Sequence, residues 1–202
     1  MDSSHPALVL TPQKKEILAV ARNLLAQYGY DGLSIRELAN QAGLATATIY
    51  HHFRDKEDIL LHVLEYDALA AYEHNNSIVE GSLPIVEKFY ALLRSYTKML
   101  HENRLTALST AQHLKSMKHH VPWFIERILP LLLEPLVAVF EQGMSQKVFR
   151  PIDSKKTAIT TLGMMHSLCS FRVAMNIDAT NEEMVAHIGD VVLHGVTVQE
   201  AK

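Results

Sequence analysis

The chain of 202 residues has a single cysteine, Cys169, and its formal net charge is −3. One cysteine excludes an internal disulfide, as is typical of proteins from reducing compartments. No apolar run reaches the roughly 18 residues that a membrane-spanning helix needs, and the amino terminus lacks the basic start and cleavage pattern of a signal peptide. The sequence therefore predicts a cytoplasmic protein without a membrane segment.

Motifs of enzymes and of metal sites are also missing. No glycine-rich phosphate loop, dinucleotide fingerprint or nucleophile elbow occurs. Among twelve histidines, His113, His119 and His120 could share a helix face, but the ligand spacings of zinc and di-iron sites are absent. We therefore expect neither an enzyme nor a bound cofactor or metal. Cys169, in an apolar segment, is expected to be a buried, inert thiol.

Apolar residues recur along the chain at helical spacing, and the alternation typical of strands is lacking. The sequence thus predicts an all-α protein of about nine helices. Pro130 and Pro135 should kink or divide one of them, and the Asn75–Ser82 stretch is the expected break between domains. The expected helices span 12–28, 34–41, 46–51, 56–75, 83–102, 105–117, 122–145, 154–176 and 181–197.

Two short helical patterns flank a turn at Gly43. Ser34 followed by Glu37 predicts a capping box at the start of the first helix. Gly43 can adopt the left-handed conformation in which a helix ends abruptly. The second helix follows at once, and Asp55 is expected to cap the next one. Helix, short turn with glycine and helix form the helix-turn-helix arrangement, whose second helix enters the major groove of DNA.

Residues 11–61 resemble the amino-terminal domain of the TetR family of bacterial transcriptional regulators. The likeness rests on AQYGY at 26–30, SIRELA at 34–39, AGL at 42–44 and TIYHHFRDKEDIL at 48–60, in that order and spacing. The rest of the chain agrees only in length and helical character. The resemblance implies a tail (1–10), a three-helix DNA-binding domain (11–57) and a larger helical ligand-binding and dimerisation domain (58–202).

The resemblance also implies which residues contact operator DNA. Their chemistry is suitable: Ala47 and the threonine methyls can pack on a thymine methyl, and Arg36 can bind guanine in a bidentate manner. Lys56 is expected at a helix N-terminus, where a phosphate is favoured. The expected DNA contacts are Ser34, Arg36, Thr46, Ala47, Thr48, Tyr50, His52 and Lys56.

Two features depart from the family pattern. Residue 45 is Ala where a Ser or Thr commonly caps the recognition helix, which removes about 1 kcal/mol unless another contact substitutes. The recognition helix also has no Lys or Arg, and the basic patch usual in such domains is lacking. We therefore expect a shallow dependence of DNA affinity on salt.

The last two helical patterns are expected to form a four-helix bundle with a second copy of the chain. The alternative is that they pack within one monomer. The residues expected on the dimer face are Ile159, Leu162, Gly163, His166, Ser170, Val185, Ile188, Val192, Gly195 and Val196.

A pocket for a small molecule is expected inside the larger domain, as in the family. An ordinary hydrophobic core is the alternative for each residue. The expected lining is Met99, His113, Trp123, Phe124, Met164, His166 and Arg172.

The sequence therefore predicts a homodimeric repressor that an unknown small-molecule effector releases from double-stranded operator DNA. The alternative is a helical ligand-binding or interaction protein without specific DNA binding.

Overall fold

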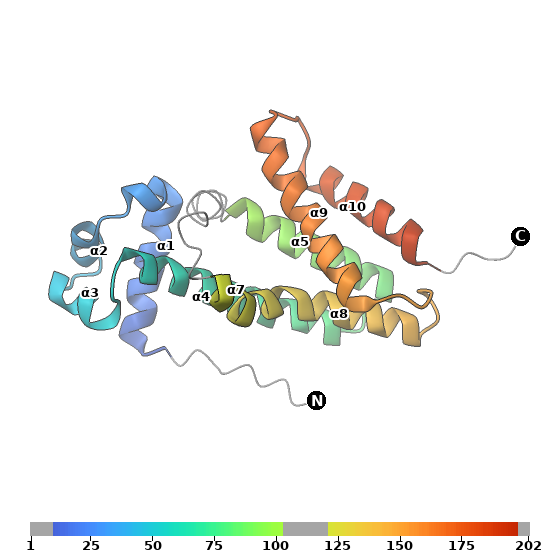
Figure 1. Ribbon diagram of the computed structural model, residues 1–202, viewed down its shortest axis with the longest axis horizontal. Helices are drawn as coiled ribbons and strands as arrows, with labels where there is room; N and C mark the ends of the chain where they lie inside the picture. Colours follow the sequence, from blue (N-terminus) through green and yellow to red (C-terminus); the bar gives the residue numbers. More distant parts are fainter. Residues whose placement is uncertain (1–9, 103–120, 198–202) are drawn as a thin grey trace, which may run out of the picture. The chain divides into compact units, whose positions relative to one another are not determined.

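The computed structural model describes residues 10–102 and 121–197, and its regular elements there are helices (Figure 1). A bridge between Phe149 and Thr197 is the one pairing of extended backbone in this part of the chain. The all-α prediction is confirmed. The predicted helix 105–117 and nearly all of the tail lie outside the described residues. The helices are α1 (Pro12–Gly32), α2 (Ile35–Gln41), α3 (Thr46–His52), α4 (Lys56–Glu80), α5 (Ile85–Glu102), α7 (Val121–Arg127), α8 (Leu129–Ser145), α9 (Ser154–Ala174) and α10 (Asn181–Val196).

Within the described ranges, no helix is long and apolar enough to cross a membrane. The same residues contain no group of three His, Cys, Asp or Glu side chains that could hold a metal ion. His113, His119 and His120 lie outside the described residues. Cys169 is a free thiol whose pKa is raised by burial, while the charge of Arg172 lowers it by less.

The described chain divides into two compact units. The amino-terminal unit holds residues 10–67, and the carboxy-terminal unit holds 68–102 and 121–197, so α4 contributes to both. The domain limits 11–57 and 58–202 stay a prediction. In the packing, Ile59, Leu60 and Val63 of α4 belong to the core of the amino-terminal unit. The small domain needs the apolar stripe of the first turns of α4 to close its core.

The core of the amino-terminal unit is built on α1. Thr11 caps this helix by accepting a hydrogen bond from Lys14 N at 3.2 Å, and Pro12 follows in the first turn, as predicted. The regular helix is interrupted at Gly29, whose φ of 69° and ψ of −177° are not helical. A further turn then runs to Gly32. The buried side chains of α1 are Ile17, Leu18, Ala21, Leu24 and Leu25.

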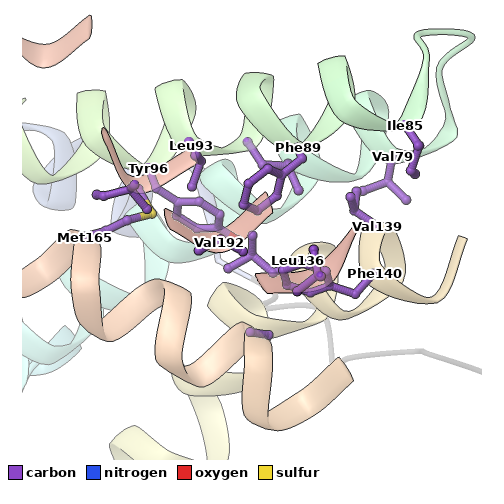
Figure 2. Packing of buried hydrophobic residues seen from close by; sticks show 14 of the residues in the cluster. Val79, Ile85, Phe89, Leu93, Tyr96, Leu136, Val139, Phe140, Met165 and Val192 are labelled. Carbon is purple, nitrogen blue, oxygen red and sulfur yellow. The ribbon is translucent and has the colours of Figure 1, made fainter. Parts of the chain in front are cut away.

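The core of the carboxy-terminal unit is organised around α5, which contacts α8, α9 and α10. Figure 2 shows Phe89 and Tyr96 of α5 facing Leu136 and Phe140 of α8. The Phe89 and Phe140 ring centroids are 5.5 Å apart in a tilted arrangement. Aromatic pairs of this kind combine a large buried area with a favourable ring geometry.

Two helix limits differ from the sequence prediction. α4 continues to Glu80 instead of ending near Asn75, so the expected break shrinks to the residues after it. Lys88 Nζ donates to Val79 O at 2.6 Å, which caps this last turn from α5. Tertiary contacts of this kind override the weak helix propensity of Asn and Ser. The predicted helix 122–145 divides at Ile128 into α7 and α8, with Pro130 in the first turn of α8 and Pro135 inside that helix.

Four residues of α10 were expected on a dimer face, and this prediction is wrong. Their side chains are buried in the core of their own unit. Their side chains contact α5 and α9, because the apolar stripe of α10 is needed to close that core. The exposed side of α10 instead carries His187, Val191 and His194. On α9, Ile159, Gly163 and His166 are exposed, as the predicted dimer face requires. The four buried residues are Val185, Ile188, Val192 and Val196.

Candidate nucleic-acid interface

The first helix of the predicted motif begins at a side-chain cap. Ser34 is extended, and its Oγ accepts a hydrogen bond from Glu37 N at 3.4 Å. The carboxylate of Glu37 accepts from Gln41 Nε2 at 2.8 Å, one turn further along α2. At the other end, Gly43 has a φ of 66°, the left-handed region where glycine is favoured. The predicted turn is therefore present, but only half of the predicted capping box forms: Ser34 caps the helix, while the Glu37 carboxylate binds Gln41 and not the backbone N–H of Ser34.

The recognition helix α3 is held to the core by one residue and otherwise displays its side chains. Ile49 is 0% exposed, whereas Tyr50 beside it is 55% exposed. Thr46 and Ala47 are exposed and Thr48 is half-buried. Ala45, at the N-cap, has extended backbone and forms no side-chain cap bond. Buried Ile49 thus fixes the helix, and hydroxyl and methyl groups are exposed on its other side. Groups of these kinds can contact the edges of bases in DNA.

The predicted DNA contacts fall into two groups by exposure. Ser34, Arg36, Thr46, Ala47 and Tyr50 are exposed, and Thr48, His52 and Lys56 are partly buried. Their role in DNA binding stays a prediction.

His52 is engaged by a residue that sequence reasoning missed. Its Nε2 lies 3.0 Å from Oε1 of Gln13, in the first turn of α1. An amide oxygen only accepts, so Nε2 of His52 donates in this contact. The amide nitrogen of Gln13 is thereby placed beside the end of the recognition helix. No local pattern could have found this pair, because it joins positions far apart in the chain.

Lys56 begins α4, as predicted, but its ammonium already has partners within the protein. Nζ donates to the carbonyl oxygen of Asp31 at 3.0 Å and lies 4.6 Å from the ring centroid of Tyr30. Burial lowers the pKa of Lys56, and the negative charge of Asp31 opposes this shift. The side chain therefore ties the start of α4 to the end of α1.

The N-terminus of α4 is capped by two carboxylates. Asp55 Oδ1 accepts from Asp58 N at 2.8 Å, and Asp58 accepts from both Arg54 N at 3.0 Å and Arg54 Nη2 at 3.2 Å. Burial alone would raise the pKa of Asp58, but the hydrogen bonds from Arg54 and the positive charges of His62 and Arg54 together outweigh burial, and the pKa is lowered. The Arg54 side chain is 77% exposed although its Nη2 is paired with Asp58, so the guanidinium also faces solvent just beyond α3.

A second contact fixes α1 against α4 in the same unit. Lys14 Nζ lies 3.0 Å from His62 Nε2 and 5.0 Å from the ring centroid of Phe53. Since an ammonium only donates, Nε2 of His62 accepts, while Nδ1 lies 2.8 Å from Asp58 O. Phe53 is 2% exposed and packs edge-on against His62. These contacts join α1 and α4 to Phe53, the residue that follows the recognition helix.

Of the residues predicted to line an effector pocket, Met164 alone lines the hollow described below, among the described part of the chain. Met99, Trp123 and Phe124 are partly buried, His166 is exposed, and His113 lies outside the described residues. Arg172 Nη1 donates to Asn181 Oδ1 at 3.1 Å. Met164 lines a hollow of about 320 Å³ between α9 and α10 that is open to the surface. The hollow is lined by Met164, Ser167, Leu168, Phe171, His187, Ile188 and Val191.

Comparison with known proteins places the motif in a family. Residues 17–63 match the sequence model described as "Bacterial regulatory proteins, tetR family". The HTH-type transcriptional repressor AcnR of Corynebacterium diphtheriae is 37% identical over 73 residues, which cover 35% of this chain and 38% of that repressor. The aligned part thus spans little more than a third of that relative.

Solved structures agree in fold over most of the chain. The fatty acid degradation regulator FadR from Bacillus halodurans superimposes with a TM-score of 0.76 at 20% identity, covering 92% of this chain and 97% of that one. The transcriptional regulator FadR from Bacillus subtilis, in complex with stearoyl-CoA, gives a TM-score of 0.70 at 22% identity, covering 89% and 95%. Residues 17–63 therefore carry the sequence pattern of the tetR family of bacterial regulatory proteins, and the aligned relative AcnR is a transcriptional repressor.

Proposed function

We propose that the protein is a ligand-responsive DNA-binding transcriptional regulator, acting in the cytoplasm as a homodimeric repressor that a small molecule releases from its operator. The observation that carries this proposal is the exposed outer side of α3. Tyr50 and the hydroxyl and methyl groups of Thr46 and Ala47 are exposed on a helix anchored by the buried Ile49. A recognition helix needs this combination of free contacts and a fixed position.

In DNA binding, the outer side of α3 would enter the major groove. Arg36, exposed on α2, would bind a guanine edge, a contact worth about 1 to 3 kcal/mol of discrimination. Tyr50 would donate to a phosphate oxygen. Gln13 and Arg54 lie close to the end of α3 and would add contacts to the backbone. Contacts of this kind set the register of the protein on the duplex.

A homodimer would join two such units through α9 and α10. A single helix-turn-helix reads a half-site weakly, and dimers place two recognition helices about one turn of DNA apart. Phe171 is 58% exposed, Ile159 49% and Val191 48%, so these helices leave apolar surface uncovered. A Cβ added at Gly163 would meet nothing within 4 Å, which leaves room for close approach of a second copy.

The effector would act through the carboxy-terminal unit. The similar FadR of Bacillus subtilis was solved with stearoyl-CoA, which supports a ligand site in this fold. α4 contributes residues to both units, so a shift of this helix would change the separation of the two recognition helices. The ligand can act only through its different affinities for the two conformations.

The test is a mobility shift with DNA from immediately upstream of the coding region. Specific binding that Tyr50→Ala and Arg36→Ala abolish, and that Lys15→Ala on the exposed side of α1 leaves intact, supports the regulator. Equal weak binding to every DNA would instead favour the alternative, a helical ligand-binding or interaction protein without specific DNA binding. An effector that changes neither operator affinity nor the separation of the recognition helices would contradict the induced release.

A further inference from the structure

The side-chain amide of Asn75 is buried, and its oxygen has no hydrogen-bond donor. Asn75 lies on α4 in the carboxy-terminal unit and is 0% exposed, and its Oδ1 accepts no hydrogen bond from a described residue. Buried polar groups in folded proteins are nearly always paired, because burial removes the hydrogen bonds that water would provide.

Tyr96 of α5 can accept a hydrogen bond from the Asn75 amide but cannot donate one to it. Tyr96 is also 0% exposed, and its hydroxyl donates to Leu132 O of α8 at 2.5 Å. Burial raises the pKa of Tyr96, while a side-chain hydrogen bond with Asn75 lowers it by less. With its proton given to Leu132, the phenol oxygen can only accept, so its partner in the amide is Nδ2 of Asn75. Oδ1 still lacks a donor.

Among the described residues of this unit, the one buried cation already has other partners. Lys88 is 8% exposed, and its Nζ donates to Val79 O at 2.6 Å and to Gln142 Oε1 at 3.1 Å. This ammonium caps the last turn of α4, where its charge also matches the helix dipole. A carboxylate brought to Asn75 would therefore be buried without a counter-charge, which is strongly unfavourable.

We propose that Asn75 is the polar recognition point for the effector and takes an uncharged hydrogen-bond donor, such as an amide N–H or a hydroxyl, carried on an apolar body. The inference rests on the proposed function and names the chemical class of its ligand. The donor group binds Oδ1 of Asn75, and Nδ2 pairs with the phenol oxygen of Tyr96 or with the ligand. Entry of the ligand displaces part of the packing around α4, and this couples binding to a change of conformation.

The experiment compares three probes with the same hydrocarbon chain by calorimetry on the full chain. Octanamide can donate, N,N-dimethyloctanamide can only accept, and octanoate at neutral pH is charged. We expect octanamide to bind about tenfold more tightly than the dimethyl amide, as one or two added hydrogen bonds allow, and octanoate to bind most weakly. Equal binding of the two amides, tighter binding of octanoate, or no binding of either amide would overturn the proposal.

Substitution of Asn75 provides the second arm. In Asn75→Leu the difference between the two amides should vanish, whereas His74→Leu, on an exposed position of the same helix, should keep it. Without any probe, Asn75→Leu should melt at the same or a higher temperature, because a buried amide with an unpaired oxygen has been removed. A clear fall in melting temperature would mean that this oxygen has a donor within the fold and would sink the idea. Asn75→Ala serves the probe comparison if the leucine variant does not fold.

Operator binding, measured separately, keeps the two proposals apart. Probes that bind through Asn75 in a protein that binds no specific DNA would overturn the proposed function and leave this inference standing. Specific DNA binding with equal affinity for the two amides would support the proposed function and overturn this inference.

Discussion

Lys56 Nζ donates to the carbonyl oxygen of Asp31 at 3.0 Å, which joins the first residue of α4 to the last turn of α1. The ammonium also lies over the ring of Tyr30. A lysine at this position was expected to bind a phosphate of DNA. In the fold it has a structural partner of its own, so one side chain both closes the amino-terminal unit and lies near the expected DNA surface.

Lys56→Met should therefore lower the stability of the amino-terminal unit by about 1 kcal/mol, since it keeps the apolar stem and loses the hydrogen bond. If Lys56 also contacts phosphate, the slope of log affinity against log salt should become shallower by about 1. Thermal melts and DNA titrations at several salt concentrations measure both effects. The control is Lys15→Met, an exposed lysine of α1. A stability loss with an unchanged slope would assign Lys56 to the fold alone.

Ala45→Ser should stabilise the amino-terminal unit by about 1 kcal/mol. Ala45 already has the extended backbone of an N-cap, and its side chain is exposed and makes no cap bond. A serine hydroxyl there could accept from a free N–H in the first turn of α3. Chemical denaturation followed by circular dichroism gives the change, and Ala47→Ser, inside the exposed side of α3, is the control. No gain for Ala45→Ser would show that the turn already satisfies these N–H groups.

Asp58→Asn should destabilise the amino-terminal unit in a pH-dependent manner. The pKa of Asp58 is lowered in the fold: burial raises it, but the hydrogen bonds from Arg54 and the positive charges of His62 and Arg54 together outweigh burial. Its contribution is therefore present above the ordinary pKa of an aspartate and is lost as the pH falls through the lowered value. The difference in melting temperature between wild type and variant should be largest above about pH 5 and shrink toward about pH 2. Glu16→Gln, an exposed carboxylate of α1, is the control, and a constant difference for Asp58→Asn would rule out this origin.

Lys88→Met should destabilise the carboxy-terminal unit by about 2 kcal/mol, because two hydrogen bonds of a buried ammonium are lost together. Val79 O would keep only the contact from Gln142 Nε2 at 3.3 Å. The matched control is Lys155→Met, an exposed lysine in the first turn of α9. Equal melting curves for the two variants would contradict the capping role.

Gly163→Leu should weaken self-association without harming the monomer. A Cβ at Gly163 meets nothing within 4 Å of its own chain, and leucine is a better helix former than glycine. If a second copy packs closely on α9, the added side chain collides with it. Sedimentation velocity measures the dimer fraction, and Asp178→Leu, exposed beyond the end of α9, is the control. An unchanged dimer fraction would exclude this part of α9 from the interface.

The helices and their caps were largely predictable, because their causes are local. Thr11 at α1 accepts the expected hydrogen bond, and the capping box of Thr180 with Glu183 at α10 is complete. The failures lie where distant residues intervene. α4 runs past Asn75 because Lys88 caps it from another helix. The contact between Gln13 and His52 likewise had no sequence signal.

The sequence by itself determined the all-α class, the turn at Gly43 and the helix-turn-helix motif, because helical periodicity, capping and left-handed glycine act over a few residues. Only the tertiary structure decided which polar groups have hydrogen-bond partners and which apolar side chains are buried. It ties Lys56 to Asp31, buries the apolar face of α10 in its own unit, and leaves Oδ1 of Asn75 without a hydrogen-bond donor. Burial and pairing depend on which helices meet, and that is a property of the whole packing and not of any single segment.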